Sequence, residues 1–340
     1  MKARNRLFPF VVAGAALFAL LALALFLFPK QDPKKMTGPP EKVTIAVSTN
    51  LNPVLVKIAE TKGFFPEEGL DVTLQLHSFG KLALQSLVDG KADFATVAET
   101  PIVFSMLKGA RLAILATIQT STKNEAIIAL KDRGIASTAD LKGRSVGVTL
   151  GTSADYYLDA HLVIESMTRM DVDIVDLKPE EMTEALLQGK VDAVSTFNPL
   201  VANLQKTLGD RGIMLRNENI YTETFNVVSM HGFPGQRPEA VRRFLRALVK
   251  AEAFVAANPE ESQQIISKFS SIDQELLAGI WNDFQFNLSL SQSLLFTLED
   301  QARWAIRSEL TERRDMPNFF ESLYIDGLRA VKPESVRIIR

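Results

Sequence analysis

Short apolar runs alternate with stretches of helical spacing along most of the chain. The runs at 43–47, 94–97 and 112–118 predict strands, because apolar residues fill them almost continuously. Between the strands, apolar positions recur every three or four residues, for example at 101–107, which predicts amphipathic helices. Strands that alternate with helices are typical of α/β folds with mainly parallel sheets. Beyond residue 237 the spacing is almost entirely helical, so we expect a helical C-terminal part.

One pattern of helix, turn and strand occurs twice. Residues 87–101 and 186–199 both place Gly-Lys-x-Asp between a helical and an extended stretch. The glycine can take the left-handed conformation that ends a helix. Both strands then run into a proline, at 99–101 and 197–199, beyond the strand end where open α/β sheets bind ligands. The repeat predicts two α/β lobes facing each other across a cleft. The alternative is an ordinary α/β unit that recurs by chance.

The N-terminus carries a long apolar run. Residues 7–28 contain no charged residue, and a run of that length can cross a bilayer core as a helix. The small-residue motif at 22–24 lies inside the run, so we interpret 7–28 as an uncleaved transmembrane signal anchor; a cleaved signal peptide is the alternative. We expect residues 1–6 in the cytoplasm and 29–41, rich in proline and glycine, as a linker.

The short basic tail and the long chain after the anchor favour one orientation in the inner (cytoplasmic) membrane. The folded part would lie on its periplasmic or extracellular side, although lysines at 30, 34 and 35 offset the charge difference on which this rule depends.

Composition narrows the classes of function. With 340 residues, 46% apolar and 23% charged, the chain is ordinary globular material for two domains. A net charge of -2 gives no indication of nucleic-acid binding. The absence of cysteine excludes disulfides, thiolate nucleophiles, thiolate metal sites and a lipid-carrying cysteine.

Two predicted helix starts have the chemistry of anion sites. Gly80 and Lys81 open one helix, and Gly151, Thr152 and Ser153 open another after a strand. Free amides and hydroxyls at a helix start can hold a carboxylate, sulfonate or phosphate. A solvated lysine and a plain Ser or Thr cap are the alternatives.

Several short segments, in order, resemble a known family. The stretches 58–60, 63–72, 90–94 and 140–148 are similar to the substrate-binding proteins of nitrate, sulfonate and taurine ABC importers. They are also similar to thiamine-pyrimidine-precursor binding proteins. The resemblance implies an α/β periplasmic-binding-protein fold of type II, with two hinge crossovers and a ligand held between the lobes. It also implies binding without catalysis, and an ABC permease and ATPase as partners.

On this basis we expect lobe 1 to comprise 42–120 and 225–340, with the C-terminal helices, and lobe 2 to comprise 121–224. The crossings are expected near 119–124 and 221–226. The candidate ligand contacts at strand ends, helix starts and crossings are Asn50, Lys81, Glu99, Thr100, Thr122, Thr152, Ser153, Phe197, Asn198 and Asn226.

Among these candidates Glu99 would be the most informative. If its carboxylate faces the cleft, it favours a ligand that carries an amine over a simple inorganic anion. The alternative is a carboxylate at a helix N-terminus, where it complements the helix dipole.

Other functions have less support. Three histidines and one His-Glu pair, at 161 and 165, give a weak metal signal, and we expect no metal, cofactor or catalytic residue. We find no phosphate-binding or nucleophile-elbow motif. Pyrimidine synthases share the fold but are associated with a cysteine-rich motif that this chain lacks. A membrane-tethered sensory or adaptor module stays open as the alternative to an importer component.

Overall fold

The computed structural model describes residues 39–339, which from Pro40 on belong to one compact unit. The expected cytoplasmic tail 1–6, the signal anchor 7–28 and most of the linker 29–41 lie outside the described residues. Within 39–339, no helix combines the length and the apolar character needed to span a membrane.

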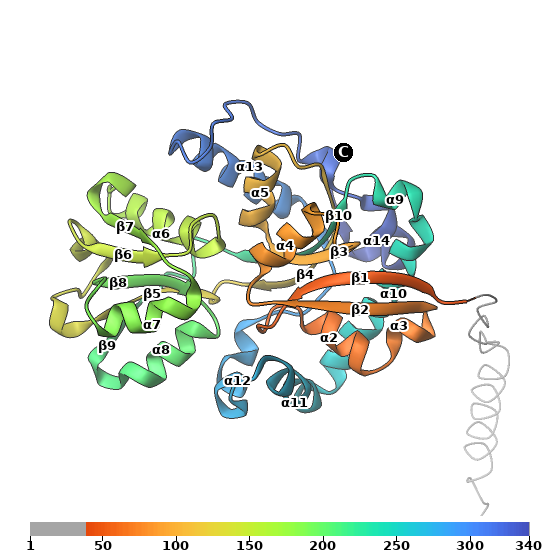
Figure 1. Ribbon diagram of the computed structural model, residues 1–340, viewed down its shortest axis with the longest axis horizontal. Helices are drawn as coiled ribbons and strands as arrows, with labels where there is room; N and C mark the ends of the chain where they lie inside the picture. The colour runs from red at the N-terminus through yellow and green to blue at the C-terminus, as the bar shows by residue number, and fades with distance from the viewer. Residues whose placement is uncertain (1–38, 340) are drawn as a thin grey trace, which may run out of the picture. The chain divides into compact units, whose positions relative to one another are not determined.

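The first sheet has the strand order β2-β1-β3-β10-β4 (Figure 1). Its parallel strands are β1 (Glu41–Ser48), β2 (Leu70–His77) and β3 (Phe94–Ala98). Strand β10 (Glu223–Met230) returns from far along the chain and runs antiparallel to β3 and to β4 (Leu112–Ser121). The sheet is therefore completed by a segment that lies after the second sheet in the sequence.

The second sheet repeats this scheme in the order β7-β6-β8-β5-β9. Strands β6 (Ser145–Val148), β7 (Asp173–Asp176) and β8 (Ala193–Phe197) are parallel. Strand β5 (Glu125–Leu130) is antiparallel to β8 and to β9 (Gly212–Leu215). Successive residues of β5 enter different apolar clusters, so both faces of this sheet are covered.

Helices follow the strands as the apolar spacing predicts. Those of the first sheet are α2 (Val54–Thr61), α3 (Phe64–Glu67), α4 (Gly80–Val88) and α5 (Glu99–Leu107), and those of the second are α6 (Ser153–Ile164), α7 (Pro179–Leu187) and α8 (Leu200–Leu208). The C-terminal part is helical as expected: α9 (Phe233–Gln236), α10 (Pro238–Ala257), α11 (Pro259–Ser270), α12 (Gln274–Ile280), α13 (Gln292–Arg307) and α14 (Ile325–Val331). The short strands β11 (Leu290–Ser291) and β12 (Val336–Arg337) pair in parallel.

The repeated Gly-Lys-x-Asp motif has the same structural role in both copies. Gly90 and Gly189 take the left-handed conformation, with φ of 72° and 70°. Three residues later, Asp93 accepts a hydrogen bond from the backbone N–H of Thr44 in β1 at 2.8 Å. Asp192 accepts one from the N–H of Ser145 in β6 at 3.0 Å. In each lobe the motif ends a helix and joins the following strand to its parallel neighbour.

The two crossings between the sheets differ from the expected segments. The outgoing link comprises only 122–124, because β4 continues to Ser121, and the returning link comprises 216–222. The expectation that 119–121 and 223–226 lie in connectors was wrong. Both segments stay in strands because β4 and β10 remain hydrogen-bonded to each other as far as the hinge, where Ser121 lies opposite Glu223.

Helix α10 contributes stacked aromatic contacts to the core of the first lobe. Its Phe244 stacks on Phe94 of β3, with ring centroids 4.5 Å apart, and on Phe65 of α3 at 5.7 Å. The helical spacing expected beyond residue 237 is confirmed for α10, whose Val241, Phe244 and Leu245 face this core and are fully buried. Stacked rings in such a core add to the stabilisation that comes from area burial alone.

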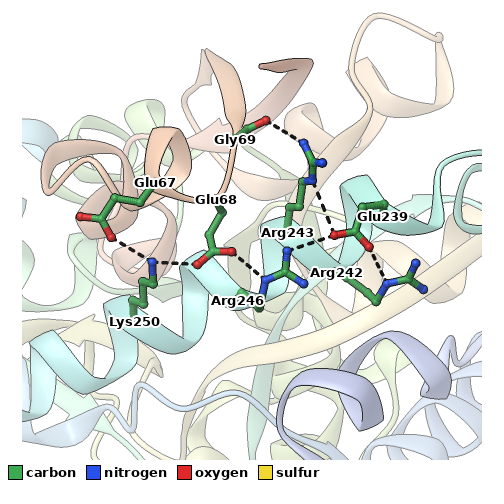
Figure 2. A network of polar contacts seen from close by, with 8 residues as sticks. All are labelled: Glu67, Glu68, Gly69, Glu239, Arg242, Arg243, Arg246 and Lys250. Atoms are coloured by element: carbon green, nitrogen blue, oxygen red, sulfur yellow. Dashed lines mark hydrogen bonds and ion pairs between the residues drawn. The ribbon is translucent and has the colours of Figure 1, made fainter. Parts of the chain in front are cut away.

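A network of ion pairs joins the outer side of α10 to the turn before β2 (Figure 2). Glu68 accepts from Arg246 Nε and pairs with Lys250 Nζ, both at 2.7 Å. Glu67 pairs with the same lysine at 2.9 Å, but its side chain is 55% exposed against 13% for Glu68. Burial raises the pKa of the Glu68 carboxyl, yet hydrogen bonds from Arg246 and Lys250 outweigh it and hold the pKa below the ordinary 4.5.

These exposures predict different effects for two neighbouring carboxylates. Replacement Glu68→Gln is expected to lower the free energy of unfolding by about 1–2 kcal/mol at pH 7, because it removes charge-assisted bonds at a mostly buried site. Glu67→Gln is expected to change it by less than about 0.5 kcal/mol.

Urea unfolding at pH 7 and pH 3 measures both effects. A carboxyl with a lowered pKa stabilises the fold above its unfolded pKa, and this contribution is lost as the pH falls. The Glu68→Gln variant should therefore approach the wild type at pH 3. Equal losses for the two variants at pH 7 would contradict the contacts described.

Candidate functional site

A small cavity lies between the two sheets and takes residues from both lobes. It has a volume of about 20 Å³, room for roughly one water molecule. Its walls are the ends of β1, β3 and β8, the starts of α4 and α6, and the start of β10: Asn50, Asn52, Phe79, Gly80, Lys81, Ala98, Pro101, Thr152, Ser153, Phe197, Glu223 and Phe225. The site is thus at the carboxyl ends of parallel strands, as the sequence predicts.

Two helix N-termini meet at this cavity. Helix α4 begins at Gly80, where an added Cβ would lie 3.2 Å from Val97 Cα and 3.2 Å from the ring of Phe225, so the close approach favours glycine. Helix α6 begins at Ser153 after Gly151, whose φ of 68° is left-handed. Neither helix receives a hydrogen bond from an N-cap side chain. First-turn N–H groups lack partners within their helix and can bind an anionic group.

Lys81 bridges the two lobes directly. Its Nζ donates a hydrogen bond to the carbonyl oxygen of Leu150, just before the α6 turn, at 2.8 Å. Loss of surrounding water lowers the pKa of the Lys81 ammonium, while the carboxylates of Asp176 and Asp155 act in the opposite direction. The one lysine in the cavity wall therefore adds positive charge between the two helix N-termini.

Glu99 lies outside the cavity wall and is fully buried. Its Oε1 accepts a hydrogen bond from Tyr221 Oη and another, at 2.9 Å, from Gln301 Nε2. Its Oε2 accepts from the backbone N and the Oγ1 of Thr224, both at 2.9 Å. Burial raises the pKa of the Glu99 carboxyl, and these hydrogen bonds oppose the rise. As the first residue of α5, it also occupies the helix position that suits a carboxylate.

Five of the ten ligand contacts predicted from the sequence line the cavity. Asn50, Lys81, Thr152, Ser153 and Phe197 lie together in the cavity wall.

The other five candidates lie outside the wall. Asn198 accepts from Ala202 N and donates to Lys123 O, both at 3.3 Å, and Asn226 accepts from Thr117 Oγ1 at 2.7 Å. Thr100 is buried, and Thr122 is half-buried in the outgoing crossing. Together with Glu99, these side chains are not brought into the cavity.

Sequence reasoning missed a pair of buried carboxyls at the crossings, Glu125 and Glu223. Each is the first residue of the strand after a crossing, and they are 2% and 1% exposed. Glu125 accepts a hydrogen bond from Asn124 Nδ2 at 3.0 Å, and Glu223 Oε1 accepts one from Asn52 Nδ2 at 3.4 Å. The available signal was an acidic residue directly before each apolar strand, which by itself indicates a solvated connector.

These buried carboxyls have no ion-pair partner within residues 39–339. The ion pairs of the described chain include none with Glu99, Glu125 or Glu223. Burial raises the pKa of Glu125 to about 8, with the charge of Glu99 adding to the rise and hydrogen bonds from Ser153 and Asn124 opposing it. Burial and the charges of Glu125 and Glu99 raise the pKa of Glu223 well above its ordinary value.

The raised pKa of Glu125 predicts how stability depends on pH. Its carboxyl is protonated in the fold below about pH 8 but loses its proton in the unfolded chain above about pH 4.5. Its contribution is therefore fully present below the unfolded pKa and is lost as the pH rises through the folded pKa. Glu125→Gln should flatten the fall in the free energy of unfolding between pH 5 and pH 8.

Urea titrations at several pH values across this window measure the slope. Glu68→Gln is the matched control. Arg246 and Lys250 hold the pKa of the Glu68 carboxyl low, so this variant should keep the wild-type slope between pH 5 and pH 8. An unchanged slope for Glu125→Gln would contradict the assignment of the raised pKa to this carboxyl.

Potential metal ligands do not gather in the described chain. Between residues 39 and 339 there is no group of three His, Asp or Glu side chains arranged to hold a metal ion. His161 is buried beside Thr138, whose Oγ1 lies 3.0 Å from its Nδ1, and burial lowers the pKa of His161 to about 4.

Two sheets with the same strand scheme, two crossings between them and a cavity at the meeting strand ends define the α/β fold of periplasmic binding proteins. The family model described as NMT1/THI5 like matches residues 49–262, and the chain belongs to this family.

Individual relatives agree with this assignment. A Bacillus subtilis protein named for binding aliphatic sulfonates is 24% identical over 293 residues, which are 84% of this chain and 87% of the relative. The taurine-binding periplasmic protein of Escherichia coli is 24% identical over 222 residues, 64% of this chain and 68% of that protein. The structure of the alkanesulfonate-binding protein from Xanthomonas axonopodis pv. citri, bound to MOPS, superposes with a TM-score of 0.75 at 18% identity, covering 85% of this chain and 99% of that one.

Proposed function

We propose that this protein is the extracytoplasmic solute-binding component of an ABC importer and captures a small anionic or zwitterionic organic solute by lobe closure. The observation that carries the proposal is the cavity lined by both lobes, where the N-termini of α4 and α6 converge with Lys81. The family and the sulfonate-binding and taurine-binding relatives support it. The strand order, with β10 between β3 and β4, supports the type II form of the fold.

Closure requires that the solute bind the closed arrangement better than the open one, because equal affinity would shift no population. The cavity holds about one water molecule, so an organic solute enters only when the lobes move apart. An anionic group between the two helix starts would contact amides from both lobes. It would also give Lys81 a charged partner in place of the Leu150 carbonyl. Asn50, Thr152, Ser153 and Phe197 complete the proposed contacts.

The other parts of the chain are assigned roles in the same proposed importer component. Lobe 1 is proposed as 42–120 and 225–340, and lobe 2 as 121–224, with Ser121 and Glu223 at the boundary still in strands of the first sheet. Residues 7–28 are proposed as a single-pass anchor in the inner membrane, which would hold the binding lobes near the permease and ATPase and raise their effective concentration there. Binding without catalysis is the proposed activity.

A thermal-shift screen of the full-length protein in detergent tests solute binding. The candidates are taurine, alkanesulfonates, nitrate, bicarbonate, aromatic carboxylates and aminopyrimidines. A ligand at a hundred times its dissociation constant should add roughly 2.7 kcal/mol to the free energy of unfolding and raise the melting temperature. Lys81→Met and Thr152→Ala should weaken binding of any hit.

Lys91→Met is the matched control, because this lysine is solvent-exposed and lies outside the cavity wall. A hit that Lys81→Met and Thr152→Ala leave unchanged would place binding elsewhere. No shift with any candidate would favour a membrane-tethered ligand-sensing or adaptor module.

A further inference from the structure

We propose that Glu223, with Glu125 behind it and outside the cavity wall, forms a cation subsite of the same cavity and selects solutes that carry a protonated nitrogen, such as an ammonium or amidinium group. The proposal rests on the proposed solute-binding function and specifies the class of solute. The anionic end of the solute would be held by the helix starts, and its nitrogen would be held by the carboxyls at the crossings.

A charged Glu223 carboxylate needs a positive partner, and no ion pair among residues 39–339 supplies one. Glu223 lies in the cavity wall, is 1% exposed, and has no ion pair among residues 39–339. Glu125 is equally buried and lies close enough to act on the charge of Glu223. Removing a carboxylate from water is strongly unfavourable unless a cation or several donors compensate. A positively charged solute in the cavity would supply that compensation.

Unpaired acceptor atoms around the cavity indicate that the missing group donates hydrogen bonds. Glu223 Oε2 and Asn52 Oδ1 both belong to residues of the cavity wall, and neither has a partner although both are buried. Beside Glu223, Asn124 Oδ1 and Gln119 Oε1 are also buried without a partner, as is one donor, Gln119 Nε2. Buried acceptors of native proteins are normally paired. An ammonium or amidinium group offers two or more N–H donors to such a set.

The apolar part of the wall favours the same class of solute. Phe79, Phe197 and Phe225 line the cavity together with Glu223. Aromatic faces attract organic cations, and they exclude the water that would screen the carboxylate. Nitrate or an unsubstituted alkanesulfonate would leave the acceptors unpaired and would add a further negative charge. The wall therefore discriminates between solutes with and without a nitrogen cation.

Matched pairs of solutes test the proposal by calorimetry on the full-length protein. The pairs are taurine with 1-propanesulfonate, β-alanine with butyrate, and benzamidine with benzamide, in which the charged nitrogen group is replaced by a neutral group of similar size. In at least one pair, we expect the solute with the charged nitrogen to bind about tenfold or more tightly than the solute without it. Glu223→Gln should abolish this preference, and Lys91→Met should keep it.

A second readout requires no ligand. Glu223→Gln should raise the melting temperature of the ligand-free protein at pH 8, because it removes a buried carboxylate that has no cation. Glu99→Gln is the control and should lower the melting temperature, because the Glu99 carboxylate accepts four hydrogen bonds.

The outcomes separate the two claims. Equal binding of both members of every pair that binds would overturn the cation subsite and leave solute binding intact. Stabilisation by Mg²⁺ or Ca²⁺ in place of the nitrogen cations would overturn it too. If no solute binds, the solute-binding proposal itself loses support, and the melting temperatures still test the cation subsite. A fall in melting temperature for Glu223→Gln equal to that for Glu99→Gln would show that both carboxyls are structural.

Discussion

The buried carboxylate of Glu99 joins three segments that are far apart in the sequence. It lies at the start of α5, and its donors come from the returning crossing, through Tyr221 and Thr224, and from α13, through Gln301. A carboxylate without water must receive donors from the protein, so these segments can pack here only in an arrangement that supplies them. The hinge, the first lobe and the C-terminal helix are therefore positioned by one group, and the cavity wall depends on that position.

Helix α13 extends this dependence to the second lobe. It packs beside α5 (Figure 1). Its Asp300 accepts a hydrogen bond from Tyr156 of α6 at 2.9 Å. Further along, Trp304 Nε1 donates to Asp159 of α6, which also pairs with Arg169 at 2.8 Å. The C-terminal part, for which the sequence predicted only helices, thus contacts both sides of the hinge. Opening of the lobes must break or carry along these contacts, which links the closed state to α13 as well as to a solute.

Local patterns were sufficient to predict most elements. The strand expected at 94–97 is β3, and the helix expected at 101–107 lies within α5. Gly90 and Gly189 have the left-handed conformation expected from the repeat. These features depend on residues near each other in the chain, where spacing, caps and glycine carry the information. The helix starts at Gly80 and Ser153 were found for the same reason, and the structure brings them to one cavity.

The buried polar network could not be predicted in this way. Whether Glu99 faces a ligand or the protein depends on Tyr221 and Gln301, which lie 122 and 202 residues further along. The reverse holds for Glu223. Its local pattern indicates a solvated connector, but the fold places it in the cavity wall. Periodicity describes which face of an element is apolar, but it does not describe which polar groups from distant elements meet there.

Lobe closure on a bound solute would shorten the distance between the two lobes. The chain has no cysteine, so fluorophores can be attached to Gln85→Cys on α4 and Glu180→Cys on α7, both of which are exposed. Energy transfer between them would be followed during titration with the tightest solute of the matched pairs. Lobe closure predicts a saturable shift to a shorter distance, with a midpoint at the calorimetric dissociation constant. A solute that binds at that constant while the distance stays unchanged would contradict it.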